Sequence, residues 1–354
     1  MSEKKLKTAM LGLEEDSDLL LEAAIASDYF EIEAVADRDT QAAQQKAREY
    51  NCEAYDDYRR LVIQNEFDCL FVAAGLHECF KYVKEAINKG FNVLKLPPLG
   101  RDFEEAAELV CLADEKKAKF AVAEADTFAK SYLILRKSLK GQTKEHIYLL
   151  KGNCITTGRS SKPWRTDPKL SGGGVLLYEA YSLIDVVMSN FTTPEQVYCI
   201  NTNIAPDKRQ RKYLPEDTAI VTMKFSENMI GNILVSRSIG AEAAQEILKI
   251  YGKERVFCVS RSEYLQTDAT GKLEKHFLSE DKNEAMIKVL ENFGLSILKP
   301  QENSLKSSGF ENLKTMAVIE SAYLSSRTGT PEEPRKILQM KGFEPADFLG
   351  PEHG

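Results

Sequence analysis

The stretch Cys69–Ala74 reads CLFVAA, an uninterrupted run of six apolar residues. The segment that follows, His77–Lys89, has the spacing of an amphipathic helix, and Gly90 comes directly after it. A continuous apolar run of this length is typical of a strand buried on both faces of a parallel sheet. A glycine just beyond the last helical residue is a common helix stop. Together they predict one strand–helix unit of a parallel sheet.

The same alternation extends in both directions from this unit. Helix patterns separate further strand-like runs at Leu6–Leu11, Glu31–Ala36, Asn92–Leu96 and Phe120–Ala123. Parallel strands require crossover connections, which helices usually provide. We therefore predict a doubly wound α/β domain of the Rossmann type over residues 1–125.

The pattern changes after residue 125 to strands joined by short turns. Six segments fit this description: Ile147–Ile155, Gln196–Asn203, Thr218–Phe225, Met229–Ser236, Glu246–Tyr251 and Arg255–Ser260. Three helices are expected among them, at Gly174–Ser189, Asn283–Leu298 and Asn312–Ser326. This order predicts an α+β domain with an open antiparallel sheet over residues 126–330. The remaining residues, 331–354, are expected to form a surface tail.

Composition narrows the classes of function. The 354 residues include 47 Lys and Arg against 54 Asp and Glu, a net charge of −7, which argues against nucleic acid and against anionic membranes as partners. No apolar run approaches the ~20 residues of a spanning helix, and the charged N-terminus lacks a signal-peptide core. Seven cysteines and four histidines show no metal-ligand spacing. We expect a cytoplasmic protein with reduced thiols and no metal site.

Several short motifs occur in a fixed order along the chain. They are Ala34–Asp39 after the second strand, Pro98–Gly100 after the fifth, Lys162–Arg165 (KPWR), Leu170–Leu177 (LSGGGVLL) with Ile184-Asp185 behind it, and Ala322–Ser325. In this order they resemble the glucose–fructose oxidoreductase/inositol dehydrogenase family (Gfo/Idh/MocA), over roughly residues 6–330. That family pairs a Rossmann domain with an open antiparallel sheet.

The resemblance implies an NAD(P)-dependent oxidoreductase that acts on a sugar, a polyol or a related hydroxy compound. It also implies a small-molecule ligand in the cleft between the domains and a homodimer or homotetramer formed through the C-terminal sheet. A second interpretation stays open, because the chemical positions depart from the family pattern. The chain is then a non-catalytic family member that senses a small molecule or binds a partner protein.

The cofactor loop is the first departure. The family carries G-x-G-x-x-[GAS] between the first strand and the first helix, and here the stretch is Gly12-Leu13-Glu14-Glu15-Asp16-Ser17. Gly12 remains, but Glu14 replaces the second glycine, which normally allows the backbone to approach the diphosphate. Consecutive carboxylates also repel a phosphate. We expect NAD or NADP to bind weakly or not at all.

Five further residues match cofactor positions of the family. Asp37 ends the second strand, where an acidic residue accepts hydrogen bonds from the adenosine ribose, and Arg38 beside it could take a 2′-phosphate or stack on adenine. His77 matches a histidine at the start of the fourth helix, with local packing as the alternative. Trp164 and Arg165 match residues that approach the nicotinamide and the substrate.

The catalytic positions are replaced as well. The family's E-K-P falls on Leu96-Pro97-Pro98, so Lys95 lies two residues before the expected lysine, on the same side of the strand and ~7 Å away. The family's Asp and His, four residues apart on one helix face, fall on Tyr178 and Ser182. Lys95 and Tyr178 are therefore the candidate catalytic residues, with the alternative that Tyr178 lines a polar cleft without chemistry.

Overall fold

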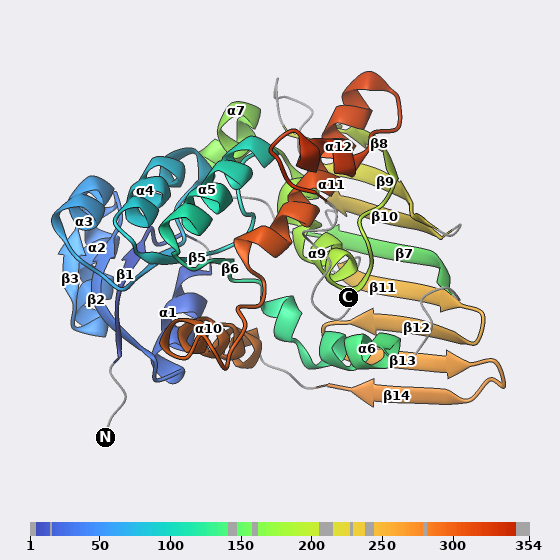
Figure 1. Ribbon diagram of the computed structural model, residues 1–354, viewed down its shortest axis with the longest axis horizontal. Helices are drawn as coiled ribbons and strands as arrows, with labels where there is room; N and C mark the ends of the chain where they lie inside the picture. Colours follow the sequence, from blue (N-terminus) through green and yellow to red (C-terminus); the bar gives the residue numbers. More distant parts are fainter. Residues whose placement is uncertain are drawn as a thin grey trace. The chain divides into compact units, whose positions relative to one another are not determined.

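The computed structural model describes residues 5–14, 16–140, 147–157, 162–204, 215–226, 229–237, 244–278 and 282–344 (Figure 1). The chain divides into two compact units. Unit 1 comprises Met1–Phe128 and Asp281–Asn312, and unit 2 comprises Ala129–Glu280 and Leu313–Gly354. The helix expected at Asn283–Leu298 is thus part of unit 1, whereas the order of elements in the sequence places it in the second domain.

Unit 1 is built on a parallel sheet of six strands in the order β3-β2-β1-β4-β5-β6. This is the strand order of a doubly wound dinucleotide-binding fold, and it confirms the predicted α/β class. The CLFVAA segment supplies β4, which is buried along its whole length between β1 and β5. The strands are β1 (Leu6–Leu11), β2 (Phe30–Ala36), β3 (Glu53–Tyr55), β4 (Cys69–Val72), β5 (Asn92–Lys95) and β6 (Phe120–Val122).

Helices cover both faces of this sheet. On one face α10 packs on α1, and Phe293 of α10 lies against Phe30 and Phe71, with ring centroids 6.3 and 6.4 Å apart (Figure 1). This contact explains why a segment so far along the chain belongs to unit 1. The helices are α1 (Ser17–Ala26), α2 (Thr40–Tyr50), α3 (Tyr58–Gln64), α4 (Leu76–Asn88), α5 (Phe103–Lys116) and α10 (Lys282–Leu298), with a 3₁₀ turn, η1, at Ala125–Phe128.

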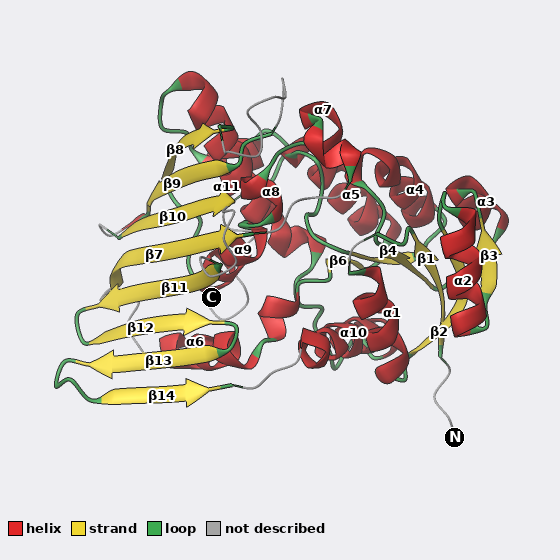
Figure 2. Ribbon diagram, turned by 180° about the vertical axis from the view of Figure 1, so that it is seen from behind, coloured by secondary structure: helices red, strands yellow, loops and turns green. Residues whose placement is uncertain are grey.

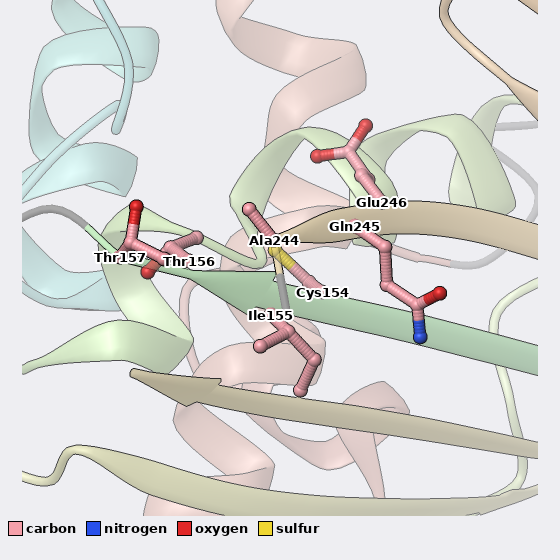
Figure 3. A pocket seen from close by; sticks show the side chains of 7 residues that line it. All are labelled: Cys154, Ile155, Thr156, Thr157, Ala244, Gln245 and Glu246. Carbon is pink, nitrogen blue, oxygen red and sulfur yellow. The ribbon is translucent and has the colours of Figure 1, made fainter. Parts of the chain in front are cut away.

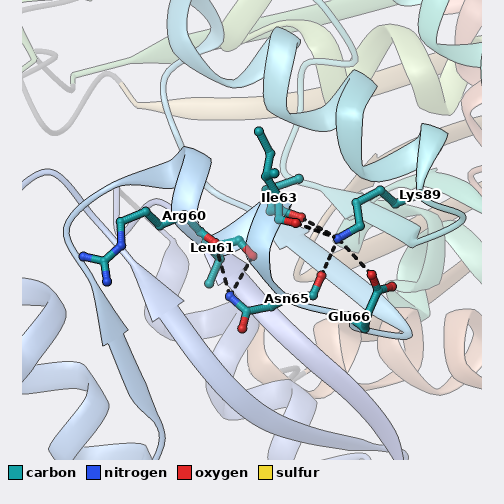
Figure 4. Close-up of polar contacts among 7 residues, drawn as sticks. Arg60, Leu61, Ile63, Asn65, Glu66 and Lys89 are labelled. Carbon is teal, nitrogen blue, oxygen red and sulfur yellow. Dashed lines mark hydrogen bonds and ion pairs between the residues drawn. The ribbon is translucent and has the colours of Figure 1, made fainter.

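Lys89 caps the C-terminal end of α3 in unit 1. The Lys89 ammonium donates to the carbonyl oxygens of Val62, Ile63 and Asn65 at 3.1, 3.1 and 2.5 Å, and it pairs with Glu66 at 3.1 Å (Figure 4). The last carbonyls of a helix have no partner within the helix, and a cation there also favours the helix dipole. Lys89 therefore stabilises the turn that leads into β4.

Unit 2 is built on a sheet of eight strands in the order β14-β13-β12-β11-β7-β10-β9-β8 (Figure 2). The sheet is mixed and mostly antiparallel, because the central strands β7 and β10 run parallel while the other neighbours are antiparallel. The strands are β7 (Ile147–Thr156), β8 (Gln196–Thr202), β9 (Thr218–Lys224), β10 (Ile230–Arg237), β11 (Gln245–Gly252), β12 (Arg255–Ser260), β13 (Glu263–Asp268) and β14 (Leu273–Phe277).

The helices of unit 2 lie on one face of its sheet (Figure 2). Ser325 of α11, for example, accepts a hydrogen bond from the Cys199 amide of β8 at 3.1 Å. On the opposite face, Ile200 and Ile220 keep 62% and 42% of their surface exposed. The helices are α6 (Lys130–Lys140), α7 (Pro168–Ser171), α8 (Val175–Tyr178), α9 (Tyr181–Asn190), α11 (Gly309–Thr328) and α12 (Pro334–Gln339), with a 3₁₀ turn, η3, at Pro163–Thr166.

The segment expected to be a surface tail is partly structured. Glu332 pairs with Val197 of β8 through two backbone hydrogen bonds of 2.8 Å. Helix α12 follows and buries Leu338. An unpaired edge strand is a template for unwanted pairing, so this segment protects the edge of the sheet.

No single helix in the described ranges has the length and hydropathy needed to cross a membrane. One bent pair, Pro168–Tyr178 with Tyr181–Asn190, meets the length and composition criteria only when its two parts are taken together.

Candidate functional site

The loop after β1 packs against, and hydrogen-bonds to, other parts of the same chain. Gly12 has a φ of +86°, and its amide donates to the Ala36 carbonyl at 2.8 Å. A Cβ at this position would lie 2.5 Å from the backbone of Ala74, in the loop after β4. The glycine is therefore required both by its left-handed backbone and by the close approach of a neighbouring loop.

The next two amides of this loop are also engaged. Leu13 donates to the Asp37 carboxylate at 2.7 Å, and Glu14 donates to the Ala73 carbonyl at 3.1 Å. Such amides, at the start of a helix after a glycine turn, usually hold the diphosphate of a dinucleotide. In this conformation the amides of Leu13 and Glu14 are donated within the chain, and Glu14 stands where the family pattern has a glycine.

A small charged cluster lies at the same edge of the sheet, beside Asp37. The Arg38 guanidinium lies 2.9 Å from the Glu78 carboxylate, and His77 Nε2 lies 3.1 Å from the same carboxylate. Burial, together with the charges of Asp37, Glu78 and Glu14, raises the pKa of Tyr58 well above its usual range. The structure thus brings Asp37, Arg38 and His77 to the edge where the sequence predicted a cofactor, and it pairs Arg38 and His77 through Glu78.

Lys95 ends β5 at the same edge and is 3% exposed. Its ammonium donates to the carbonyl oxygens of Pro98 and Leu96, at 2.5 and 3.2 Å. Burial lowers the pKa of Lys95, while the charges of Cys79, Glu105 and Glu14 act in the opposite direction. Lys95 is therefore held by the loop that follows it, in a buried environment that lowers the pKa of its side chain.

Three of the predicted residues in unit 2 form one aromatic cluster. The Arg165 guanidinium lies 4.7 Å from the centre of the Tyr178 ring and 5.5 Å from that of Trp164. The two rings are 6.2 Å apart in an edge-on arrangement. The Tyr178 hydroxyl donates to the Ser171 carbonyl at 2.7 Å. Tyr178 is thus fixed by its ring and by its hydroxyl group.

The single helix expected at Gly174–Ser189 is instead two helices. α8 ends at Tyr178, and α9 begins at Tyr181. The Ala180 amide bonds to the Val175 carbonyl rather than to the carbonyl four residues before it, and the Cys154 thiol donates to the Glu179 carbonyl at 3.2 Å. The break invalidates the argument that Tyr178 and Ser182 share a helix face, because that spacing requires a continuous helix.

A pocket of about 480 Å³ lies at the ends of β7 and β11 in unit 2 (Figure 3). Polar and apolar residues line it together: Cys154, Ile155, Thr156, Thr157, Ala244, Gln245 and Glu246. Arg237 is the register partner of Thr156 on β10. Its guanidinium lies 3.8 Å from the Glu179 carboxylate, and its side chain is 17% exposed. Within the described residues, Arg237 Nε and Thr156 Oγ1 are buried and have no hydrogen-bond partner.

The sequence analysis missed Arg237, although a signal was present. Ile233 and Val235 occupy the buried face of β10, so strand alternation places Arg237 on the same face. A charged residue at an inward position is unusual and points to a function. The described residues contain no group of three or more His, Cys, Asp or Glu side chains that could hold a metal ion.

Two family models match the chain. The oxidoreductase family with an NAD-binding Rossmann fold matches residues 6–124, and the GFO/IDH/MocA C-terminal domain matches residues 146–257. An uncharacterized oxidoreductase of Schizosaccharomyces pombe is 27% identical over 200 residues, which cover 54% of this chain and 54% of that protein. The match therefore spans about half the length of this curated relative.

Solved structures show the same fold at low identity. An oxidoreductase from Agrobacterium radiobacter, in complex with NAD⁺, L-tartaric acid and magnesium, has a TM-score of 0.83 at 15% identity, covering 95% of this chain and 100% of that one. The WlbA dehydrogenase from Bordetella pertussis, in complex with NADH and UDP-GlcNAcA, has a TM-score of 0.79 at 18% identity, covering 93% and 99%. With both family models matching in order, this chain belongs to the Gfo/Idh/MocA family of NAD-binding oxidoreductases.

Proposed function

We propose that this protein is an NAD(P)-dependent oxidoreductase that acts on a sugar, a polyol or a related hydroxy compound. The observation that supports the substrate class is a group of polar side chains at the pocket of unit 2. Thr156, Thr157, Gln245 and Glu246 line it, and the separated Arg237–Glu179 pair adjoins Thr156. A hydroxyl group both donates and accepts hydrogen bonds, so a site that offers both suits a neutral hydroxylated ligand.

In this proposal the dinucleotide binds weakly. The amides of Gly12, Leu13 and Glu14 must exchange bonds within the chain for bonds to a diphosphate, and the Glu14 charge opposes that exchange. Lys95 and Tyr178 are the residues proposed to handle the substrate proton. The pKa of Lys95 is lowered by burial, which is the direction of shift that a proton acceptor needs.

The test is a titration of the protein with NADH and NADPH, followed by assays on a panel of sugars and polyols with both cofactors. Lys95→Ala and Tyr178→Phe should each lower kcat by about 10²–10⁴-fold, the usual size of acid–base assistance. Arg237→Met should lower kcat/KM at least about tenfold, because the buried guanidinium that would donate hydrogen bonds to the substrate is lost. The exposed Arg335→Met serves as the matched control. Turnover that survives both Lys95→Ala and Tyr178→Phe unchanged would remove these residues from the mechanism.

A second function is favoured by one observation. The polar atoms that the chemistry needs are already bonded inside the chain: Lys95 to two carbonyls, and the cofactor-loop amides to Ala36, Asp37 and Ala73. A protein that binds a small molecule without turnover would show this arrangement. Saturable binding of a polyol, with no NADH or NADPH binding at millimolar concentration, would favour this non-catalytic role.

We also propose that the protein is at least a homodimer formed through the open face of the unit 2 sheet. Ile200 and Ile220 are register partners on β8 and β9 and are both exposed. Adjacent exposed apolar residues usually mark an interface. Light scattering should show a dimer or tetramer that Ile200→Lys dissociates, whereas Ile25→Lys, at an exposed isoleucine of α1, should leave it intact. The predicted cytoplasmic location and the ligand position between the domains remain predictions.

A further inference from the structure

The glycine triplet Gly172-Gly173-Gly174 is packed against the chain itself. A Cβ on Gly173 would lie 2.1 Å from the Tyr323 hydroxyl oxygen, and a Cβ on Gly174 would lie 2.0 Å from the Glu216 carbonyl oxygen. Real Cβ atoms do not approach other atoms so closely, and a backbone atom cannot easily move away. The glycines are therefore required by a close approach of Glu216 and Tyr323.

Glu216 accepts hydrogen bonds from the backbone amides at the start of α8. Its carboxylate accepts hydrogen bonds from Gly174 at 2.9 and 3.0 Å and from Leu176 at 3.0 Å, and its backbone carbonyl accepts one from Val175 at 3.1 Å. The first amides of a helix have no partner within the helix, and a carboxylate there is favourable. One residue thus anchors three successive amides.

Tyr323 of α11 completes this arrangement. Its hydroxyl group donates to Glu216 Oε1 at 2.8 Å, and Glu216 is 9% exposed. A buried carboxylate is costly unless it is hydrogen-bonded, and these donors meet that requirement. Burial raises the pKa of Glu216, while the Tyr323 hydroxyl and the amides oppose that rise.

The anchored helix is one turn long and ends at Tyr178. Any movement of its first residues is therefore passed directly to the Tyr178 ring, which lies against Arg165 and near Trp164. We propose that Glu216 is a positioning residue: its carboxylate, oriented by Tyr323, sets the place of Tyr178 in the aromatic cluster. The catalytic consequence of this placement rests on the proposed function, but the placement does not.

The experiment uses Trp164, which is the only tryptophan of the chain. Acrylamide quenching of its fluorescence is measured on the full-length protein, at a temperature below the unfolding transition measured for each variant. Tyr178→Ala provides the reference for a cluster that has lost its tyrosine. Glu216→Gln keeps the volume, but its amide nitrogen cannot accept hydrogen bonds. Its quenching constant should rise at least about twofold towards the Tyr178→Ala value.

The matched control is Asp185→Asn. Asp185 is also a buried carboxylate of unit 2, but it belongs to α9 and accepts a hydrogen bond from the Thr315 hydroxyl of α11 at 3.0 Å. This variant should lower the unfolding temperature and leave Trp164 quenching at the wild-type value. Equal changes in Glu216→Gln and Asp185→Asn would overturn the proposal, because they would reflect general loosening of unit 2.

Tyr323→Phe gives a second, milder test that does not depend on Glu216→Gln folding. It removes only the hydroxyl donor, so quenching should rise in the same direction by a smaller factor. Wild-type quenching in Tyr323→Phe and, where it folds, in Glu216→Gln would also overturn the proposal. Because quenching needs neither cofactor nor substrate, a failure to detect turnover would count against the proposed function and not against this inference.

Discussion

Two glycine turns, one in each unit, lead into a helix. In unit 1, Gly12 precedes α1, and in unit 2 the triplet ending at Gly174 precedes α8. Both turns donate an amide to a carboxylate of their own chain, Leu13 to Asp37 and Gly174 to Glu216. They differ in the residue that accepts: Glu216 is buried and accepts from three amides of its turn, whereas Asp37 is only partly buried and accepts from Leu13.

The difference shows what a glycine turn can and cannot reveal. A glycine reports that something comes very close to the backbone. Whether that neighbour is a ligand or another part of the chain depends on distant residues. In unit 2 the neighbour is Glu216, 42 positions after Gly174, and no ligand is needed to explain the glycines. In unit 1 the neighbour of Gly12 is Ala74, and the rest of the loop remains the proposed cofactor site.

The largest effect on stability is expected for a substitution in the glycine turn of unit 2. Gly174→Ala would put a Cβ 2.0 Å from the Glu216 carbonyl oxygen and should lower the free energy of unfolding by about 3 kcal/mol or more. Urea denaturation measures it. Gly231→Ala in the same unit is the control, because its Cβ would meet only side-chain atoms, at 3.1 Å, and should cost about 1 kcal/mol. If Gly174→Ala lowered the free energy of unfolding no more than Gly231→Ala does, the Glu216 backbone would not restrict this turn.

The unit 1 turn offers a control with the same backbone angle. Gly12 and Gly90 have φ values of +86° and +85°, but only Gly12 has backbone atoms within 4 Å of an added Cβ. Gly90→Ala should cost about 1 kcal/mol, from the left-handed conformation alone. Gly12→Ala should cost about 2 kcal/mol more, because the Ala74 loop must also move. Equal losses would show that Ala74 does not restrict the turn.

Dinucleotide affinity tests whether the unit 1 turn is open to a ligand. Glu14→Gly should strengthen NADH binding about tenfold, equivalent to about 1.4 kcal/mol, because it removes a like charge and a side chain from the phosphate position. Calorimetric titration measures the affinity. Glu14→Gln separates the two causes, since it removes only the charge. Tight binding by the wild-type protein would contradict the expectation that Glu14 blocks the site.

The smallest effect is expected for the pH dependence of the free energy of unfolding that comes from Lys95. The folded pKa of Lys95 is lowered by burial, so between that pKa and about 10.5 the unfolded chain binds more protons than the folded one. Wild-type stability should therefore rise relative to Lys95→Met as the pH increases from 7 towards 10.5, by about 1.4 kcal/mol per pKa unit of lowering. Chemical unfolding of both proteins across this range measures the difference, and a constant difference would exclude a lowered pKa.

Local patterns in the sequence were enough for much of the fold. The CLFVAA run predicted β4, and the glycine after Lys89 correctly placed the end of α4. Trp164, Arg165 and Tyr178 were each singled out by motif, and the structure places them in one cluster. Hydrophobic period, helix stops and short motifs act over a few residues, so they can be read directly from the chain.

Contacts between distant residues were decided only in the tertiary structure. α10 returns to unit 1 because Phe293 packs with Phe30, and β10 runs parallel to β7 although an antiparallel sheet was expected. The break after Tyr178 and the pairing of Glu216 with the glycine triplet likewise depend on residues that lie far apart in sequence. A short stretch of sequence shows which secondary structure its residues favour, but not which distant segment will pack against it. That distant segment determines which amides, carboxylates and rings come together.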